Sequence, residues 1–250
     1  MRITIKTQEQ IEKMRVAGRI LVKLDEILRA EIKPGITTLE LDKIAEDFIR
    51  SQGAVPSFKG YGGFPGSICT SVNEEIVHGI PSKRKLQEGD IISIDMGSYI
   101  HGYHGDCART YGVGEVSPEA GRLMDVTRQS FFEGIRFAKS GHFLNEIGAA
   151  IQTYVEENGF SVVREYVGHG IGRNLHESPE VPNYKVPGRG VRLESGMVLA
   201  IEPMVNMGSR KIKVLSDGWT AVTADGLYAA HYENTVLITQ GEPEIFTLLP

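Results

Sequence analysis

The chain has 250 residues, 41% of them hydrophobic, and carries a formal net charge of −5 at pH 7. This ordinary composition predicts a soluble globular protein, and its scattered basic residues do not favour nucleic-acid binding. Because the sequence has no membrane-length apolar run, no secretory signal in its polar start and only two widely separated cysteines, we expect a reduced, cytoplasmic protein without membrane attachment.

Helical and strand-forming segments follow one another in a regular order. Apolar residues at helical spacing and helix-start signals, including the capping-box pattern Thr37-Thr-Leu-Glu40, predict four helices. We expect these helices over residues 7–30, 37–52, 117–139 and 145–158. The expected early strands are 67–73, 90–97 and 105–113, and the last ninety residues are rich in β-formers and turns. This order predicts an α+β fold with helices packed on a largely antiparallel sheet.

The sequence contains an internal repeat at an offset of about a hundred residues. It comprises a helix, a His-Gly-Ile tripeptide and an apolar strand that ends on an acid. The paired segments are 33–53 with 139–159, 77–81 with 168–172, and 86–95 with 193–202. Because the three segments recur in the same order, chance similarity is disfavoured. We therefore expect one domain, 1–250, built of two halves, about 1–113 and 114–250, with a pseudo-two-fold axis.

Each copy of the repeated strand ends on a carboxylate that has an acidic companion further along the chain. The pairs are Asp95 with Asp106 and Glu202 with Glu233. Four acids at the ends of apolar strands cannot all be ionised without a counter-charge, because an unpaired buried ion costs several kcal/mol. Neither repeated strand contains Lys or Arg, so the sequence predicts that the cation comes from outside the chain.

A histidine completes this set of candidate ligands. His169 stands between glycines that let the backbone approach a neighbouring group closely, and imidazole is a common metal ligand. Four carboxylates and one imidazole are unlike a structural zinc site, which is closed by Cys and His. They suit two adjacent divalent ions, such as Mn²⁺, Co²⁺, Fe²⁺ or Zn²⁺, which activate a hydroxide and polarise a carbonyl or phosphoryl group.

These motifs resemble those of the type I methionine aminopeptidases. The match runs from the first helix through Thr239, and its most specific segments are Ser71–Pro81, Ile94–Gly97, Tyr103–Asp106, Gly168–Gly172, Ile201–Pro203 and Tyr232–Thr235. The resemblance implies the pita-bread fold, a pseudo-two-fold duplication with the metal site at the centre of the sheet. It also implies a single catalytic domain that requires two divalent metal ions.

The resemblance assigns each metal ligand a role. Asp106 and Glu233 are expected to bridge the two ions, and Asp95 to chelate one of them. His169 and Glu202 are expected to complete the shell of the other ion. Glu202 is also expected to handle the proton of the attacking hydroxide.

Further residues are implied to bind the substrate. His78 and His176 are expected to contact the scissile peptide, with His176 stabilising the carbonyl oxygen as charge develops. The methionine side chain is expected among aromatic and sulfur groups, which suit a thioether. This pocket comprises Tyr61, Phe64, Cys69 and Trp219. The chain departs from some family members at the rim residues Phe58 and Leu175 and at Asn234, which follows the metal-binding Glu233.

The implied activity is removal of the initiator methionine from nascent polypeptides whose second residue is small. The expected partners are nascent chains, and the ribosome is a candidate site of their binding. The protein is expected to be a monomer. Two alternatives stay open. One is an X-Pro aminopeptidase or prolidase-like hydrolase on the same scaffold, although the chain begins too abruptly for the extra N-terminal domain of that group. The other is a non-catalytic relative, which would be expected to have lost ligands that are all present here.

Overall fold

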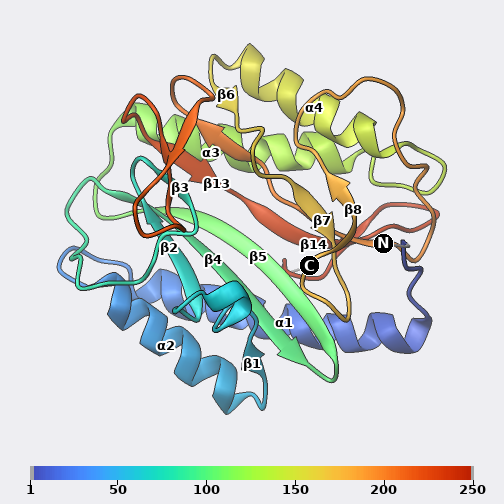
Figure 1. Ribbon diagram of the computed structural model, residues 1–250, viewed down its shortest axis with the longest axis horizontal. Coiled ribbons are helices and arrows are strands. Elements are labelled where there is room, and N and C mark those ends of the chain that lie inside the picture. The colour runs from blue at the N-terminus through green and yellow to red at the C-terminus, as the bar shows by residue number, and fades with distance from the viewer. Residues whose placement is uncertain (1–2, 249–250) are drawn as a thin grey trace.

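A central sheet with helices packed against it dominates the computed structural model, which describes residues 3–248 (Figure 1). Residues 1–2 and 249–250 of the expected 1–250 domain lie outside the described residues. The four expected helices are present as α1 Gln8–Glu31, α2 Thr38–Ser51, α3 Pro118–Ile135 and α4 Leu144–Glu157. Within the described part of the chain, no helix is long and apolar enough to cross a membrane.

The main sheet has nine strands, and all of its described pairings are antiparallel, which confirms the expected α+β class. Its path runs β1-β4-β5-β14-β9-β7-β8, with β2 beside β4 and β15 beside β14. Its strands are β1 Val55–Pro56, β2 Ile68–Val72, β4 Ile91–Ile100, β5 Tyr103–Gly112, β7 Gly168–Gly170, β8 Glu177–Val181, β9 Val198–Ile201, β14 Glu233–Leu237 and β15 Glu244–Ile245. The two halves of the chain therefore meet where β5 pairs with β14.

Two three-stranded sheets complete the described β-structure. One has the order β13-β10-β6, with β6 Ser161–Val162, β10 Met204–Asn206 and β13 Ala229–His231. The other has the order β11-β12-β3, with β3 Glu75–Val77, β11 Ile212–Val214 and β12 Ala221–Thr223. A short 3₁₀ turn, Tyr61–Gly63, lies in the glycine-rich loop before β2.

Each helix pair is packed over its own apolar core. The cluster beneath α1 and α2 includes Leu21, Leu28, Leu41, Ile92 and Cys107. The cluster beneath α3 and α4 includes Leu123, Phe131, Ile151, Leu199 and Val236. In Figure 1 the two helix pairs lie at opposite ends of the view, with the central strands running between them. The two helix pairs thus cover separate apolar cores, and the main sheet connects them.

Candidate active site

Sheet register brings three of the four predicted carboxylates onto one face at the junction of the halves. Asp95 on β4 and Glu233 on β14 both lie opposite Ala108 of β5. Directly opposed residues in antiparallel strands point to the same side, and so do residues two apart on one strand. Asp106 stands two residues before Ala108, so its side chain shares that face with Asp95 and Glu233.

The same reasoning places the remaining two predicted ligands. Ala200 of β9 lies opposite both Thr235 of β14 and His169 of β7. Because Thr235 is two residues from Glu233, and Glu202 is two residues from Ala200, all these side chains point to the face that carries the other acids. The alternation of the pleated strands therefore gathers ligands from four strands and the residue just beyond β9.

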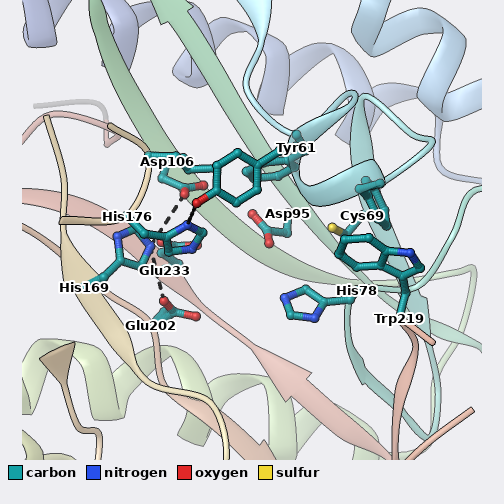
Figure 2. A pocket seen from close by; sticks show the side chains of 13 residues that line it. Tyr61, Cys69, His78, Asp95, Asp106, His169, His176, Glu202, Trp219 and Glu233 are labelled. Carbon is teal, nitrogen blue, oxygen red and sulfur yellow. Dashed lines mark hydrogen bonds and ion pairs between the residues drawn. The ribbon is translucent and has the colours of Figure 1, made fainter. Parts of the chain in front are cut away.

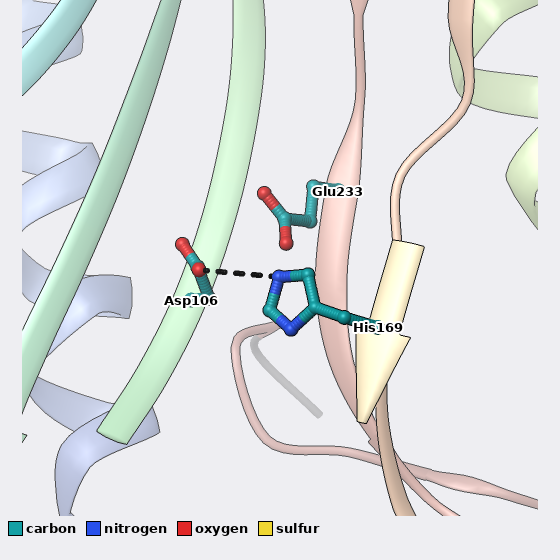
Figure 3. A group of neighbouring side chains, drawn as sticks. All are labelled: Asp106, His169 and Glu233. Atoms are coloured by element: carbon teal, nitrogen blue, oxygen red, sulfur yellow. Dashed lines mark ion pairs between the residues drawn. The ribbon is translucent and has the colours of Figure 1, made fainter. Parts of the chain in front are cut away.

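Distances confirm that the side chains come close together. The Nε2 atom of His169 lies 3.6 Å from Oε1 of Glu202 and 3.9 Å from Oδ2 of Asp106. Figure 3 shows the His169 ring facing both Asp106 and Glu233, and ligand atoms of these three residues lie within 4.8 Å of one another. The Nδ1–H of His169 donates to the carbonyl of Gly170 at 2.9 Å, which leaves a lone pair on Nε2 for a metal ion.

The donor set fits divalent metal ions. Among the described residues, buried oxygens with no hydrogen-bond partner include Oδ1 of Asp95, Oδ1 of Asp106 and Oε1 of Glu233. Buried polar atoms normally have partners, so three such oxygens at one point fit the binding of a cation. A second group of possible ligands, Glu202, His231 and Glu233, also has its atoms within 4.8 Å and shares Glu233 with the first group.

The electrostatics of the cluster favour the same interpretation. Burial raises the pKa of Asp95 to about 7. Burial and the nearby charge of Asp95 raise the pKa of Asp106 and of Glu202 well above the usual range, and burial and Asp106 do the same for Glu233. Such carboxyls hold protons unless a cation replaces them.

The buried Arg109 does not supply that cation. Its guanidinium donates to the backbone carbonyl of Glu233 and, at 2.8 Å, to those of Ala108 and Thr247, rather than to the acidic side chains. It also donates to Oδ1 of Asn234 at 2.7 Å. Asn234, at which the chain departs from some family members, therefore helps to anchor Arg109 in the sheet.

A single cavity joins the carboxylate cluster to an aromatic pocket (Figure 2). Every predicted site residue lines it: Tyr61, Phe64, Cys69, His78, Asp95, Asp106, His169, His176, Glu202, Trp219 and Glu233, together with Phe58 and Leu175. Cys69 lies opposite Asp95 in the sheet, so the pocket begins directly beside the acids. The rings of Phe64 and Trp219 meet edge to face at 5.2 Å. Burial raises the pKa of the Cys69 thiol, which leaves this end of the cavity uncharged.

Two neutral histidines stand around the cluster. The Nδ1 atom of His176 is hydrogen-bonded to the Tyr61 hydroxyl at 2.8 Å, and burial lowers its pKa. His78 has a left-handed backbone with φ of 60°, and its ring lies edge to face with Tyr166 at 5.1 Å. Burial lowers the pKa of His78 to about 4, so both imidazoles are uncharged at neutral pH.

Sequence reasoning missed His231, which is 1% exposed at the end of β13. Its Nε2 atom lies 3.7 Å from Oε2 of Glu202. A signal was present in the sequence, because His231 precedes Glu233 by two residues and an extended chain places such residues on one side. His231 was not predicted because it is neither acidic nor flanked by glycines.

Comparisons with known proteins agree with this geometry. A model of metallopeptidase family M24 matches residues 12–240. Methionine aminopeptidase of Clostridium acetobutylicum is 58% identical over 247 residues, covering 98% of this chain and 99% of that protein. The crystal structure of methionine aminopeptidase from Thermotoga maritima has a TM-score of 0.97 and 46% identity, and the match covers 99% of this chain and 100% of that one.

The chain belongs to metallopeptidase family M24. The resemblance to type I methionine aminopeptidases and the pita-bread fold are confirmed. Xaa-Pro dipeptidase from Bacillus anthracis is less similar, with 26% identity and a TM-score of 0.78, and the match covers 98% of this chain but only 62% of that one. The prolidase-like alternative is therefore less well supported.

Proposed function

We propose that this protein is a metalloexopeptidase that removes the initiator methionine from nascent polypeptides whose second residue is small. The observation that carries the proposal is one cavity in which a cluster of buried carboxylates adjoins an uncharged aromatic and thiol pocket. The cluster provides hydrolytic chemistry, and the pocket suits an unbranched thioether. The full-length likeness to methionine aminopeptidases supports the same activity.

The five ligands have the roles expected from the family. Asp106 and Glu233 would bridge two divalent ions, Asp95 would chelate one of them, and His169 and Glu202 would complete the shell of the other. Mn²⁺, Co²⁺, Fe²⁺ or Zn²⁺ would suit these ligands, and when bound such ions would supply Lewis acidity and activate a water molecule. The carboxylate of Glu202 accepts the proton from the attacking water and carries it toward the leaving amine.

Two histidines and the pocket position the peptide. His176 donates a hydrogen bond to the carbonyl oxygen of the first peptide bond as negative charge develops there, and its bond to Tyr61 holds the ring in place. His78 contacts the scissile peptide from the other side of the cavity, opposite His169 (Figure 2). The second substrate residue must pass between the loops that carry His78 and His169, which restricts its size. The methionine side chain enters between Phe64, Trp219 and Cys69.

The remaining expectations complete the proposal. Residues 1–250 form a single catalytic domain of two repeated halves, about 1–113 and 114–250. The protein acts as a cytoplasmic monomer on the N-termini of nascent chains, including chains still at the ribosome. The separate helix-pair cores and the pairing of β5 with β14 support the two-half organisation.

A peptide panel tests the proposed function against the X-Pro alternative. We expect metal-loaded protein to release methionine from Met-Ala-Ser and Met-Gly-Ser, to cleave Met-Leu-Ser poorly, and to leave Lys-Ala-Ser intact. A lysine would enter the apolar pocket without a counter-charge, which is costly. Cleavage of Ala-Pro-Ser as fast as Met-Ala-Ser would overturn the methionine assignment in favour of an X-Pro peptidase.

A further inference from the structure

His231 is held rigidly beside the proposed metal ligand Glu202. Its backbone N–H donates to Oγ1 of Thr110 at 2.9 Å, and that hydroxyl donates to the His231 carbonyl at 2.8 Å. His231 also lies opposite Met204 in the β10–β13 pair, two residues beyond Glu202. These contacts fix the backbone from which the imidazole projects, so its approach to Glu202 is a property of the fold.

The facing atoms of the two side chains are both without a described partner. Nε2 of His231 is buried and has no hydrogen bond among residues 3–248. Oε2 of Glu202 lies 3.7 Å away, so the two atoms face each other and an approach of about 0.5–1 Å gives an ordinary N–H···O bond. No other side chain in the described chain donates to this carboxylate, because the Asn183 amide bonds only the Glu202 backbone carbonyl.

The two oxygens of Glu202 face two histidines of different character. Oε1 lies 3.6 Å from Nε2 of His169, whose Nδ1–H is committed to the Gly170 carbonyl. His169 therefore offers a lone pair at Nε2, which suits a metal ion and not a bond to a carboxylate. His231 has no such commitment and is free to carry its hydrogen on Nε2. Carboxylate ligands commonly accept a hydrogen bond from a residue outside the metal shell.

We propose that His231 is a positioning residue that donates its Nε2–H to Oε2 of Glu202 and thereby orients Oε1 toward the metal centre. This inference rests on the proposed function of Glu202 as a ligand and proton carrier. The bond fixes the carboxylate rotamer in both roles, so His231 acts on metal affinity and on turnover without touching the peptide.

Three substitutions isolate the donor atom. The side-chain amide of His231→Gln places an N–H donor near the position of Nε2, that of His231→Asn places it nearer Nδ1, and His231→Leu removes it. His142→Gln, at a half-exposed position in the connection between α3 and α4, serves as the control. For each protein we would measure Mn²⁺ affinity by calorimetry on metal-free protein, the visible spectrum with Co²⁺, the Tm without metal, and kcat and KM for Met-Ala-Ser.

We expect His231→Leu and His231→Asn to lose roughly 10–100-fold in Mn²⁺ affinity and in kcat, the scale seen for residues that support metal ligands. KM should change little, because His231 does not contact the peptide. His231→Gln should recover most of both losses, and the Co²⁺ spectrum of each folded variant should keep the wild-type shape. His142→Gln should match the wild type throughout.

Other outcomes would overturn the proposal. If His231→Gln is as defective as His231→Leu and its Co²⁺ spectrum changes, His231 is a direct ligand. If only the Tm falls while affinity and kcat hold, its role is purely structural. If His231→Leu does not fold, the contrast between Gln and Asn still decides, since equal metal affinity in these two variants would contradict a donor at Nε2. Wild-type protein that binds Mn²⁺ but does not cleave Met-Ala-Ser would overturn the proposed function, while the affinity measurements would still test His231.

Discussion

His78 and His169 open the same His-Gly-Ile tripeptide in the two halves of the chain, yet the structure uses them differently. His169 lies in the extended strand β7, with its ring bonded to Gly170 and its Nε2 atom among the acids. His78 follows β3 with a left-handed backbone, and its ring lies against Tyr166. The two copies of the tripeptide therefore bring their histidines to one cavity with different backbone conformations, in keeping with the proposed roles of His169 at the metal centre and His78 at the substrate.

A second repeated position shows the same divergence in a supporting role. Asp42 of α2 and Gly148 of α4 are aligned by the repeat. The Asp42 carboxylate accepts the backbone N–H groups of Ser67 and Ile68 at 2.7 and 3.0 Å, which fixes the start of β2. At Gly148 a Cβ atom would lie 2.2 Å from the carbonyl oxygen of Pro182, so only glycine lets that loop approach the helix. The α2 helix thus contacts its neighbouring segment through the Asp42 side chain, whereas α4 allows close approach of its neighbouring loop because Gly148 has no side chain.

The largest expected effect separates the two repeated histidines. His169→Ala should lose nearly all activity and much of its metal affinity, because the ion cluster generates the nucleophile. His78→Ala should lose activity to a smaller extent while binding metal like the wild type. Metal content, circular dichroism and peptide hydrolysis would be measured on both variants. Equal loss of metal in the two variants would erase the distinction between them.

Removal of His176 should have the next largest effect. His176→Ala is expected to lower kcat by roughly 10²–10³-fold, the scale for loss of one oxyanion donor, with metal content unchanged. Tyr61→Phe, which removes the hydroxyl bonded to His176, should lower kcat less. Single-turnover kinetics would measure both variants. Loss of metal from His176→Ala would instead assign this histidine to the metal shell.

The divergent pair Asp42 and Gly148 predicts two stability losses of similar size. Asp42→Ala leaves buried N–H groups unpaired, which costs about 1–3 kcal/mol. Gly148→Ala forces the helix away from the Pro182 backbone, and such overpacking costs about 1–3 kcal/mol. Denaturant unfolding would measure both. Gly121→Ala in α3 is the matched control, since its Cβ would meet nothing within 4 Å, and an equal loss there would remove the steric explanation.

The smallest expected effect concerns the pocket. Norleucine in place of the first methionine should lower kcat/KM modestly, since one small apolar change is worth about 1–3 kcal/mol at most. Replacing Cys69 with Ser should lower kcat/KM for both peptides, because a polar hydroxyl would then face the apolar side chain of the substrate. Parallel progress curves for the methionine and norleucine peptides would test this. Complete rejection of norleucine would show that the thioether sulfur is specifically recognised.

The helices could be predicted from local rules, whereas the gathering of the site was predicted from the internal repeat and the family resemblance. Apolar periodicity and caps gave the helices, and the repeat implied that Asp95 and Glu202 would be placed alike. The spacing of His231 from Glu233 was a local signal, but the approach of His231 to Glu202 could not be predicted, because it depends on the β10–β13 pairing between short strands. The bond between His176 and Tyr61 likewise joins loops 115 residues apart, which no local pattern specifies.

The central claim is that the buried acids require divalent cations, and the Tm of metal-free protein against pH tests it most directly. Because burial raises the folded-state pKa of Asp95 to about 7, and raises those of Asp106, Glu202 and Glu233 well above their usual range, the metal-free folded protein holds protons that the unfolded chain releases. Its stability should therefore fall as the pH rises from about 4 through 7. Mn²⁺ at a hundred times its Kd should raise the Tm at pH 7.5 by roughly 5–10 °C, and by less at pH 5.5, where protons compete for the ligands. A Tm that is flat from pH 5.5 to 7.5 and does not respond to Mn²⁺, Co²⁺, Fe²⁺ or Zn²⁺ would contradict the claim.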